Sequence, residues 1–387
     1  MKTLKPMGNL KKEKAEIAKG DLIRAAKRGK QHHDNIKKIQ NIPKSCDHDL
    51  VIFESGSQIY VYVTTKECSE AFNSGRNPDP HLKCIDNTQI SKSFLNTFKS
   101  DLQKNIRNDD EKGVKNQGIK LGLKLIPKNI QAKLKEELQN DDNKIKNVWI
   151  FCEENDIDYL WEWIYCEEKD FFWGKKFHIC RIPNDRISKC GLKPQNIEVK
   201  QYAFISPNNC QCGYKDKNCF NSTFFSLREA LNSIRNLNGV DCMHFVAKID
   251  IYQENRDIYE SCEDAFKALG CYDQDNKYKF KLLFLNIRIP ENFNDYKEII
   301  ESPEYKLRLL ELKDLFTRSA EIWIDTNLDL LDGLAPNFAN DFYSELKNGR
   351  KTIPEVLTEA RKKGNEFCRL AYVVKGNPST TVSWTAS

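Results

Sequence analysis

A short, wholly apolar run in the C-terminal half most constrains how this chain can fold. Residues 279–290 read KFKLLFLNIRIP, and the four residues from Leu282 to Leu285 are apolar without alternation and are bounded by polar residues. Such a run is typical of a strand that is buried on both faces of a sheet. In open α/β sheets the carboxyl ends of the strands carry the chemistry. The sequence therefore places Arg288 where a catalytic residue would be expected.

Strand and helix patterns alternate from residue 147 onwards. The sequence predicts strands at residues 148–152, 202–206, 242–247, 282–287, 321–325 and 369–374. It predicts helices at residues 226–237, 305–316 and 337–346, and one more that opens with the capping box TIPE at 352–355. This alternation predicts an α/β fold with a mostly parallel central sheet and helices on both faces. We expect strands 242–247 and 282–287 to be adjacent and parallel, because consecutive strands joined by a helix usually are.

The N-terminal part has a different pattern. Two β-rich runs at 50–53 and 59–63 flank a Ser-Gly-Ser turn and predict a hairpin. Helices are expected at 94–106 and 130–138, with a charged loop at 109–117 between them. We divide the chain into an arm (1–45), a hairpin and helical part (46–146) and an α/β core (147–387).

Positive charge is concentrated at the N-terminus. Residues 1–44 hold 13 Lys and Arg against four acidic residues, a net charge of +9, whereas the whole chain carries +5. A basic, partly helical or disordered arm of this kind favours weak, nonspecific binding to nucleic acid or to an acidic protein surface. The alternative is a solvated tail. The sequence has no long apolar run and no secretory signal, so we expect a cytoplasmic protein without a membrane contact.

Four segments resemble one known family in its order. They are DYLWEWIY at 158–165, VDCMHFVAK at 240–248, LFLNIR at 283–288 and, within 338–378, FANDFYSELKNG, EVLTEARKKG and LAYVVKGNP. Together they resemble the CHAT domain, a branch of the caspase-like cysteine peptidases. The resemblance covers about residues 50–384 and implies a caspase-like fold. It also implies a link to prokaryotic stress and defence systems, including CRISPR-associated ones that contain a CHAT peptidase.

The same resemblance locates the catalytic positions of the family in this chain. The family's histidine follows a first histidine by four residues, and its cysteine follows a Leu-Asn pair by two. Here the first histidine is His244 and the catalytic position holds Lys248; Leu285 and Asn286 are followed two residues later by Arg288. Such a site needs a thiolate and a histidine that takes its proton. Arginine is not a nucleophile. We therefore expect a pseudo-peptidase that acts as an adaptor or regulator of a protein partner, without a cofactor.

Two alternatives remain open at this stage. Cys242 and His244 lie two residues apart on one strand and share a face, so their side chains could meet. A buried structural pair is the simpler interpretation. Cys262 and Cys271 follow that strand, near the expected cleft, with no histidine at the family's spacing. The alternatives are thus an active cysteine peptidase with relocated residues, and a nucleic-acid-binding accessory protein that uses the arm.

The last candidates are a metal site and the partners of Arg288. Cys210, Cys212 and Cys219 lie close together, but zinc sites need four ligands, and a cysteine-rich loop is the simpler interpretation. A charged residue at the end of a buried strand needs an acceptor, since an unpaired buried charge is costly. The candidate acids for Arg288 are, in order, Asp325, Asp329 and Asp250.

Overall fold

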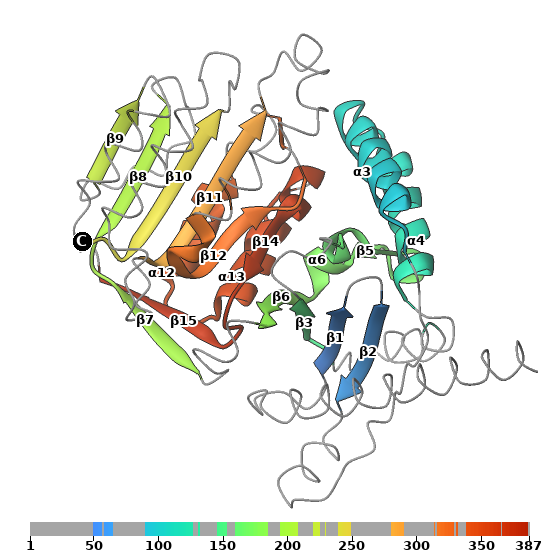
Figure 1. Ribbon diagram of the computed structural model, residues 1–387, viewed down its shortest axis with the longest axis horizontal. Helices are drawn as coiled ribbons and strands as arrows, with labels where there is room; N and C mark the ends of the chain where they lie inside the picture. Colours follow the sequence, from blue (N-terminus) through green and yellow to red (C-terminus); the bar gives the residue numbers. More distant parts are fainter. Residues whose placement is uncertain are drawn as a thin grey trace, which may run out of the picture.

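The computed structural model places a large sheet at the centre of the chain (Figure 1). The structure describes residues 49–55, 58–64, 90–126, 131, 145–152, 159–184, 194–207, 220–224, 229, 239–248, 280–289, 313, 316–328, 330–331, 338–364 and 366–385. The basic arm and most of the helices expected at 130–138, 226–237 and 305–316 lie outside these residues.

The described strands of the large sheet number 11, in the order β2-β1-β3-β6-β14-β12-β11-β10-β8-β9, with β13 beside β11. Their bounds are β1 Asp49–Ser55, β2 Gln58–Thr64, β3 Asn147–Cys152, β6 His178–Pro183, β8 Tyr202–Pro207, β9 Phe220–Phe224, β10 Cys242–Lys248, β11 Phe280–Ile289, β12 Ala320–Thr326, β13 Leu330–Leu331 and β14 Tyr372–Lys375. Only the β1–β2 and β12–β14 pairs of this sheet are antiparallel. The expected α/β class with a mostly parallel sheet is confirmed.

The sheet consists of two parallel halves that run in opposite directions. β1, β3, β6 and β14 are parallel to one another, and we call them the N-terminal half. β12, β11, β10, β8 and β9 are also parallel to one another, and we call them the C-terminal half. The antiparallel β12–β14 pair joins the two halves. On its other side β14 shares a single register row with β6, Lys375 opposite Arg181. We call this β14–β6 contact the seam.

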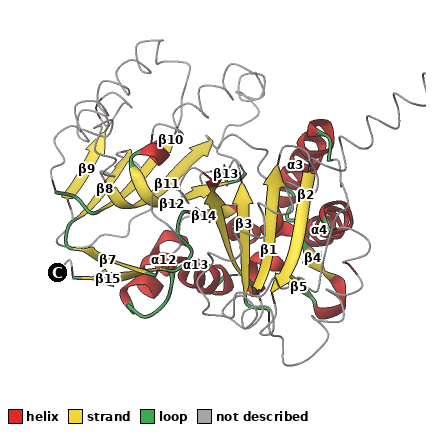
Figure 2. Cartoon of the chain, turned by 60° about the horizontal axis from the view of Figure 1, so that its bottom comes forward, coloured by secondary structure: helices red, strands yellow, loops and turns green. Residues whose placement is uncertain are grey.

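Helices cover the sheet where the chain offers apolar faces. α12 (Phe338–Lys347) and α13 (Ile353–Lys362) lie against one face, next to the small parallel pair of β7 (Gln195–Val199) and β15 (Thr380–Trp384), as Figure 2 shows. The capping box predicted at the start of α13 is present, with Glu355 reaching the Thr352 backbone N–H at 2.6 Å. On the opposite face Phe316 packs on Phe245 of β10, with ring centroids 4.6 Å apart.

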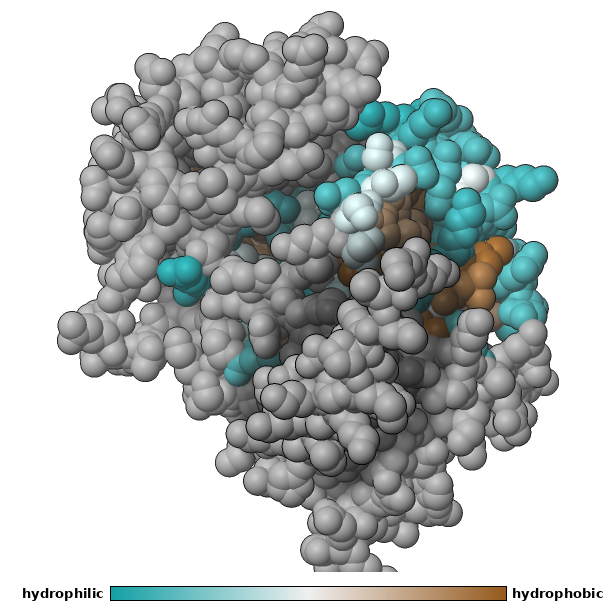
Figure 3. All heavy atoms as spheres, turned by 45° about the vertical axis from the view of Figure 1, so that its right-hand side comes forward, coloured by the Kyte–Doolittle hydropathy of each residue, from teal (hydrophilic) through white to brown (hydrophobic). Residues whose placement is uncertain are grey.

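A helix pair and a short irregular segment complete the described structure. α3 (Lys92–Arg107) and α4 (Glu111–Leu125) pack together, and Figure 3 shows mostly hydrophilic residues on their side of the molecule. α4 rests on the segment 159–177, which contains η1 (Trp161–Trp163), β4 (Tyr165–Cys166), η2 (Glu167–Lys169), β5 (Phe171–Phe172) and α6 (Trp173–Lys176). None of the helices in the described ranges is long and apolar enough to cross a lipid bilayer.

Several local predictions are confirmed. β1 and β2 form the expected hairpin, and α3 matches the helix expected at 94–106. β10 and β11 are adjacent and parallel over seven register rows. The apolar run from Leu282 to Leu285 is completely buried, as a strand covered on both faces requires.

Two local predictions are wrong. The expected charged loop at 109–117 is mostly helix, because the Asp110 carboxylate accepts the Gly113 N–H at 2.9 Å and thereby starts α4. The strand expected at 369–374 begins only at Tyr372, after the 3₁₀ turn η4 (Phe367–Ala371), and it is not the last strand because β15 follows.

Candidate functional site

The structure brings the two degenerate positions together at the carboxyl end of β10 and β11. His244 lies opposite Phe284, Val246 opposite Asn286, and Lys248 opposite Arg288 in the register of these strands. Neighbouring strands of a sheet are about 4.8 Å apart. Two residues with cationic side chains therefore occupy adjacent positions, although they are 40 residues apart in the sequence.

A third strand closes the other side of this end of β11. β12 pairs with the first half of β11 and ends at Thr326. The chain then continues in the same direction as β13, which pairs in parallel with the end of β11, Arg288 opposite Leu330 and Ile289 opposite Leu331. The backbone at Arg288 thus lies in a three-stranded ladder of β10, β11 and β13. We call this ladder the carboxyl edge.

The acid that ranked first as the partner of Arg288 has another partner. Asp325 is buried, with 5% of its surface exposed, and Lys313 Nζ lies 3.2 Å from its Oδ1. The same oxygen accepts the Thr326 backbone N–H at 2.6 Å. The other two candidate acids, Asp250 and Asp329, lie outside the described residues. The pairing of Arg288 with an acid therefore stays a prediction.

Cys242 and His244 share a face of β10, as predicted, and both are completely buried. The His244 ring lies among the rings of Phe204, Phe284 and Tyr343, with centroids 5.1, 4.5 and 5.6 Å away. Burial in this apolar surrounding raises the pKa of the Cys242 thiol well above its usual range. A thiol that is neutral and shielded from solvent is a poor nucleophile. The structural interpretation of this pair is therefore favoured over a relocated dyad.

The remaining cysteine predictions fall largely outside the described residues. Cys210, Cys212, Cys219, Cys262 and Cys271 belong to segments that the structure does not describe. Across the described residues, no group of three or more His, Cys, Asp or Glu side chains could hold a metal ion. Burial also raises the pKa of other described thiols, to about 11 for Cys368.

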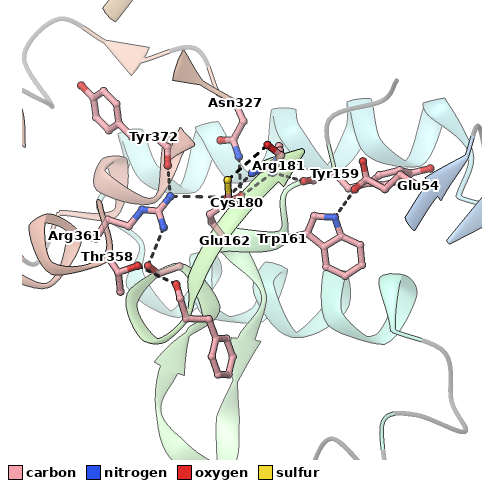
Figure 4. A network of polar contacts seen from close by, with 12 residues as sticks. Glu54, Tyr159, Trp161, Glu162, Cys180, Arg181, Asn327, Thr358, Arg361 and Tyr372 are labelled. Atoms are coloured by element: carbon pink, nitrogen blue, oxygen red, sulfur yellow. Dashed lines mark hydrogen bonds and ion pairs between the residues drawn. The ribbon is translucent and has the colours of Figure 1, made fainter. Parts of the chain in front are cut away.

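A buried charged cluster lies beside the carboxyl edge, and sequence reasoning missed it. Glu162 of η1 is completely buried and forms a double contact with Arg181 of β6, one hydrogen bond of which measures 2.9 Å (Figure 4). Arg361 of α13 lies 3.9 Å from the same carboxylate, and Asn327 Nδ2 donates to it at 3.2 Å. We call Glu162, Arg181, Asn327 and Arg361 the Glu162 cluster.

The cluster is supported by further hydrogen bonds to the backbone. Arg181 Nη2 donates to the Tyr159 carbonyl at 2.8 Å, and Arg361 Nη1 donates to the Gly174 carbonyl at 3.0 Å. Arg361 also donates to the carbonyl of Tyr372 in β14. Burial lowers the pKa of Arg361 to about 10, against the opposing effect of Glu162. The sequence signal was a charged residue inside an apolar segment, Glu162 in WEW and Arg181 in HICRIP, whereas Arg361 lies among charged residues.

Comparisons with known proteins return distant structural likenesses only. No family model and no curated protein matches the sequence. A structure of the Saccharomyces cerevisiae separase–securin complex matches with a TM-score of 0.43 at 9% identity, over 94% of this chain and 32% of that one. The Arg-specific cysteine proteinase gingipain R matches with a TM-score of 0.39 at 11% identity, over 71% of this chain and 76% of that one.

This chain spans about a third of the length of the separase chain that it matches. At such identities, and with TM-scores below 0.5, the likenesses say nothing about the activity, substrate or partner of this protein.

Proposed function

We propose that this chain is a caspase-like pseudo-peptidase that binds a protein partner at its carboxyl edge and does not cleave it. The observation that carries the proposal is the register of β10 and β11, in which Lys248 and Arg288 are direct neighbours at the carboxyl ends of the strands. Peptide cleavage by a cysteine peptidase needs a thiolate and a base with a pKa near neutrality. Arginine supplies neither, and the ordinary pKa of lysine is too high.

The same two residues indicate the chemistry of the partner. Two positive charges carried on adjacent strands repel each other, so a nearby anion is favoured. Asp325, the first candidate for that anion, is engaged by Lys313. A carboxylate or a phosphate on the partner would fit an arginine and a lysine side by side. A role in a prokaryotic defence or stress system is part of this proposal, and the CHAT resemblance supports it.

Charge reversal at the carboxyl edge tests the proposal. Full-length protein would be immobilised and exposed to a lysate of the native host, with Lys248 and Arg288 both replaced by Glu in one sample. The matched control replaces Lys112 and Lys120, two exposed lysines of α4, by Glu. We expect a discrete partner to bind the unaltered protein and the control but not the edge variant. Retention of that partner by a folded edge variant would contradict the proposal.

A further inference from the structure

The turn that joins β12 to β13 is held from three directions. Lys313 Nζ donates to the Thr326 carbonyl at 3.0 Å. The Asn327 backbone N–H donates to the carbonyl of Ala371, just before β14, at 2.8 Å. The Asn327 side chain donates to Glu162 Oε2 at 3.2 Å. A connection that only had to cross the surface would not need partners from three separate segments.

From these contacts we propose that Glu162 and Asn327 act as positioning residues for the carboxyl edge. Asn327 directly follows β12, and three residues later the chain pairs with β11 opposite Arg288. The direction in which the chain leaves β12 decides whether β13 reaches β11. By fixing Asn327, Glu162 therefore sets the backbone around Arg288 before any partner arrives.

Glu162 is a firm anchor because its carboxylate is itself fixed. Two hydrogen bonds from Arg181 and the nearby Arg361 guanidinium hold both of its oxygens, and the carboxylate has no contact with solvent. Hydrogen bonds to a charged acceptor are stronger than those between neutral groups. In a buried site of low dielectric constant, such a cluster can adopt few other hydrogen-bonded arrangements. The Asn327 side chain is thus hydrogen-bonded to a carboxylate whose position is fixed.

The Glu162 cluster also crosses the seam between β6 and β14, and through Asn327 it reaches the end of β12 on the other side of β14. Arg181 belongs to β6, Arg361 contacts the Tyr372 carbonyl of β14, and Asn327 follows β12. Backbone pairing at the seam is limited to the single row at Arg181. Side-chain contacts to one carboxylate therefore supply the connection that the backbone ladder lacks there. The carboxyl edge in the C-terminal half is positioned by a residue that packs with the N-terminal half.

Hydrogen exchange of the full chain tests this inference without a partner. We would compare the unaltered protein with Asn327→Leu, which keeps a similar volume and removes the donor to Glu162. Amides in residues 286–289 and 330–331 should exchange about tenfold faster or more in the variant, because the carboxyl edge opens locally. Amides of β3, which the cluster does not contact through Asn327, should change by less than about twofold.

The matched control is Asn377→Leu. Asn377, just after β14, is also buried, and its Nδ2 donates to Gln195 Oε1 at the same distance of 3.2 Å. Its replacement should speed exchange near β7 and β15 and leave the carboxyl edge unchanged. Equal effects of both substitutions at residues 286–289 would overturn the inference, and so would no effect of Asn327→Leu.

Two further measurements keep the test decisive. If leucine at position 327 prevents folding, Asn327→Ala removes the same donor with less bulk, and the same exchange pattern is expected. In the unaltered protein, the amides at the end of β11 should exchange within about a hundredfold of those in its buried centre, since a fixed ladder opens with its strand. Much faster exchange at the end would contradict the inference. The role of the carboxyl edge in this inference rests on the proposed binding function. Because exchange is measured without a partner, failure of the positioning role and failure of the binding function give different results.

Discussion

The two halves of the large sheet both bury aromatic rings, but they differ in the size of the charged cluster that they enclose. The N-terminal half, with the segment 159–177 packed beside it, encloses the Glu162 cluster, in which Glu162, Arg181 and Arg361 are at most 2% exposed. The described part of the C-terminal half is packed mainly with rings. Phe284 at its centre lies between His244 at 4.5 Å and Phe342 at 5.3 Å.

This difference predicts how the stability of each half responds to substitution. Aromatic packing tolerates substitution in proportion to the volume that is lost, because neighbouring rings can shift. A buried ion cluster depends on every member, because one missing partner leaves a charge in a site without water. A single substitution in the Glu162 cluster of the N-terminal half should therefore lower the free energy of unfolding by a large amount. Substitutions among the rings of the C-terminal half should lower it in proportion to the volume that is lost.

The largest effect is expected for Glu162→Gln. This change keeps the shape of the side chain but leaves two buried guanidinium groups without their carboxylate. We expect the free energy of unfolding to fall by about 3–5 kcal/mol, measured by urea denaturation. The control is Glu359→Gln, which removes a partly exposed 2.8 Å ion pair with Lys362 and should cost less than about 1 kcal/mol. Equal losses for the two variants would show that the buried Glu162 cluster is no more sensitive than an exposed ion pair.

An intermediate effect is expected where α4 meets the segment that carries Glu162. A Cβ at Gly118 would lie 2.6 Å from the Trp163 carbonyl oxygen, which is closer than packed atoms allow. Gly118→Ala should lower the free energy of unfolding by about 1–3 kcal/mol, despite the better helix propensity of alanine. Gly122→Ala is the comparison, since its Cβ would meet only the Ile164 Cγ2 atom at 3.1 Å and should be nearly neutral. Neutrality of Gly118→Ala would show that α4 can shift at no cost.

A smaller loss is expected in the aromatic half. Phe284→Leu removes ring contacts with His244, Phe342 and Tyr372 but leaves an apolar side chain in the same place. The free energy of unfolding should fall by about 1–2 kcal/mol, and the dependence of stability on urea should keep its slope. A loss of stability as large as that of Glu162→Gln would mean that the two halves do not differ in their sensitivity to a single substitution.

The smallest effect concerns pH. His178 at the start of β6 is largely buried, its Nδ1 lies 3.2 Å from Asn147 Oδ1, and burial lowers its pKa in the folded protein. The unfolded chain then binds a proton more readily than the folded one, so stability is full above the unfolded pKa and is lost as pH falls below it. We expect slightly lower melting temperatures at pH 5.5 than at pH 7.5, and a flatter profile for His178→Asn. An identical slope in both proteins would contradict this assignment.

Much of the C-terminal half could be predicted from the sequence, because its signals are local. The apolar run of β11, its adjacency to β10 and the capping box at Thr352 all follow from nearby residues. The start of α4 was predicted as a loop because acidic residues at a helix N-terminus have the composition of a loop until Asp110 is seen as the cap.

The seam and the Glu162 cluster could not be predicted, because their partners are far apart along the chain. Glu162 and Asn327 are separated by 165 residues, and β14 inserts between β12 and β6 from the far end of the sequence. No local pattern pairs a single buried glutamate with two particular arginines. The basic arm and the cysteine-rich loop stay predictions, since they lie outside the described residues.

Binding without cleavage at the carboxyl edge is tested most directly by a peptidase assay on the full chain. The purified protein would be incubated at neutral pH with a diverse peptide library and, once captured, with its partner, and the products read by mass spectrometry. Variants in which Cys242, Cys262 or Cys271 is replaced by Ala would be measured in parallel. We predict no cleavage above the buffer control in any sample. Specific cleavage that disappears on replacing one cysteine would contradict the proposal and establish a relocated catalytic site.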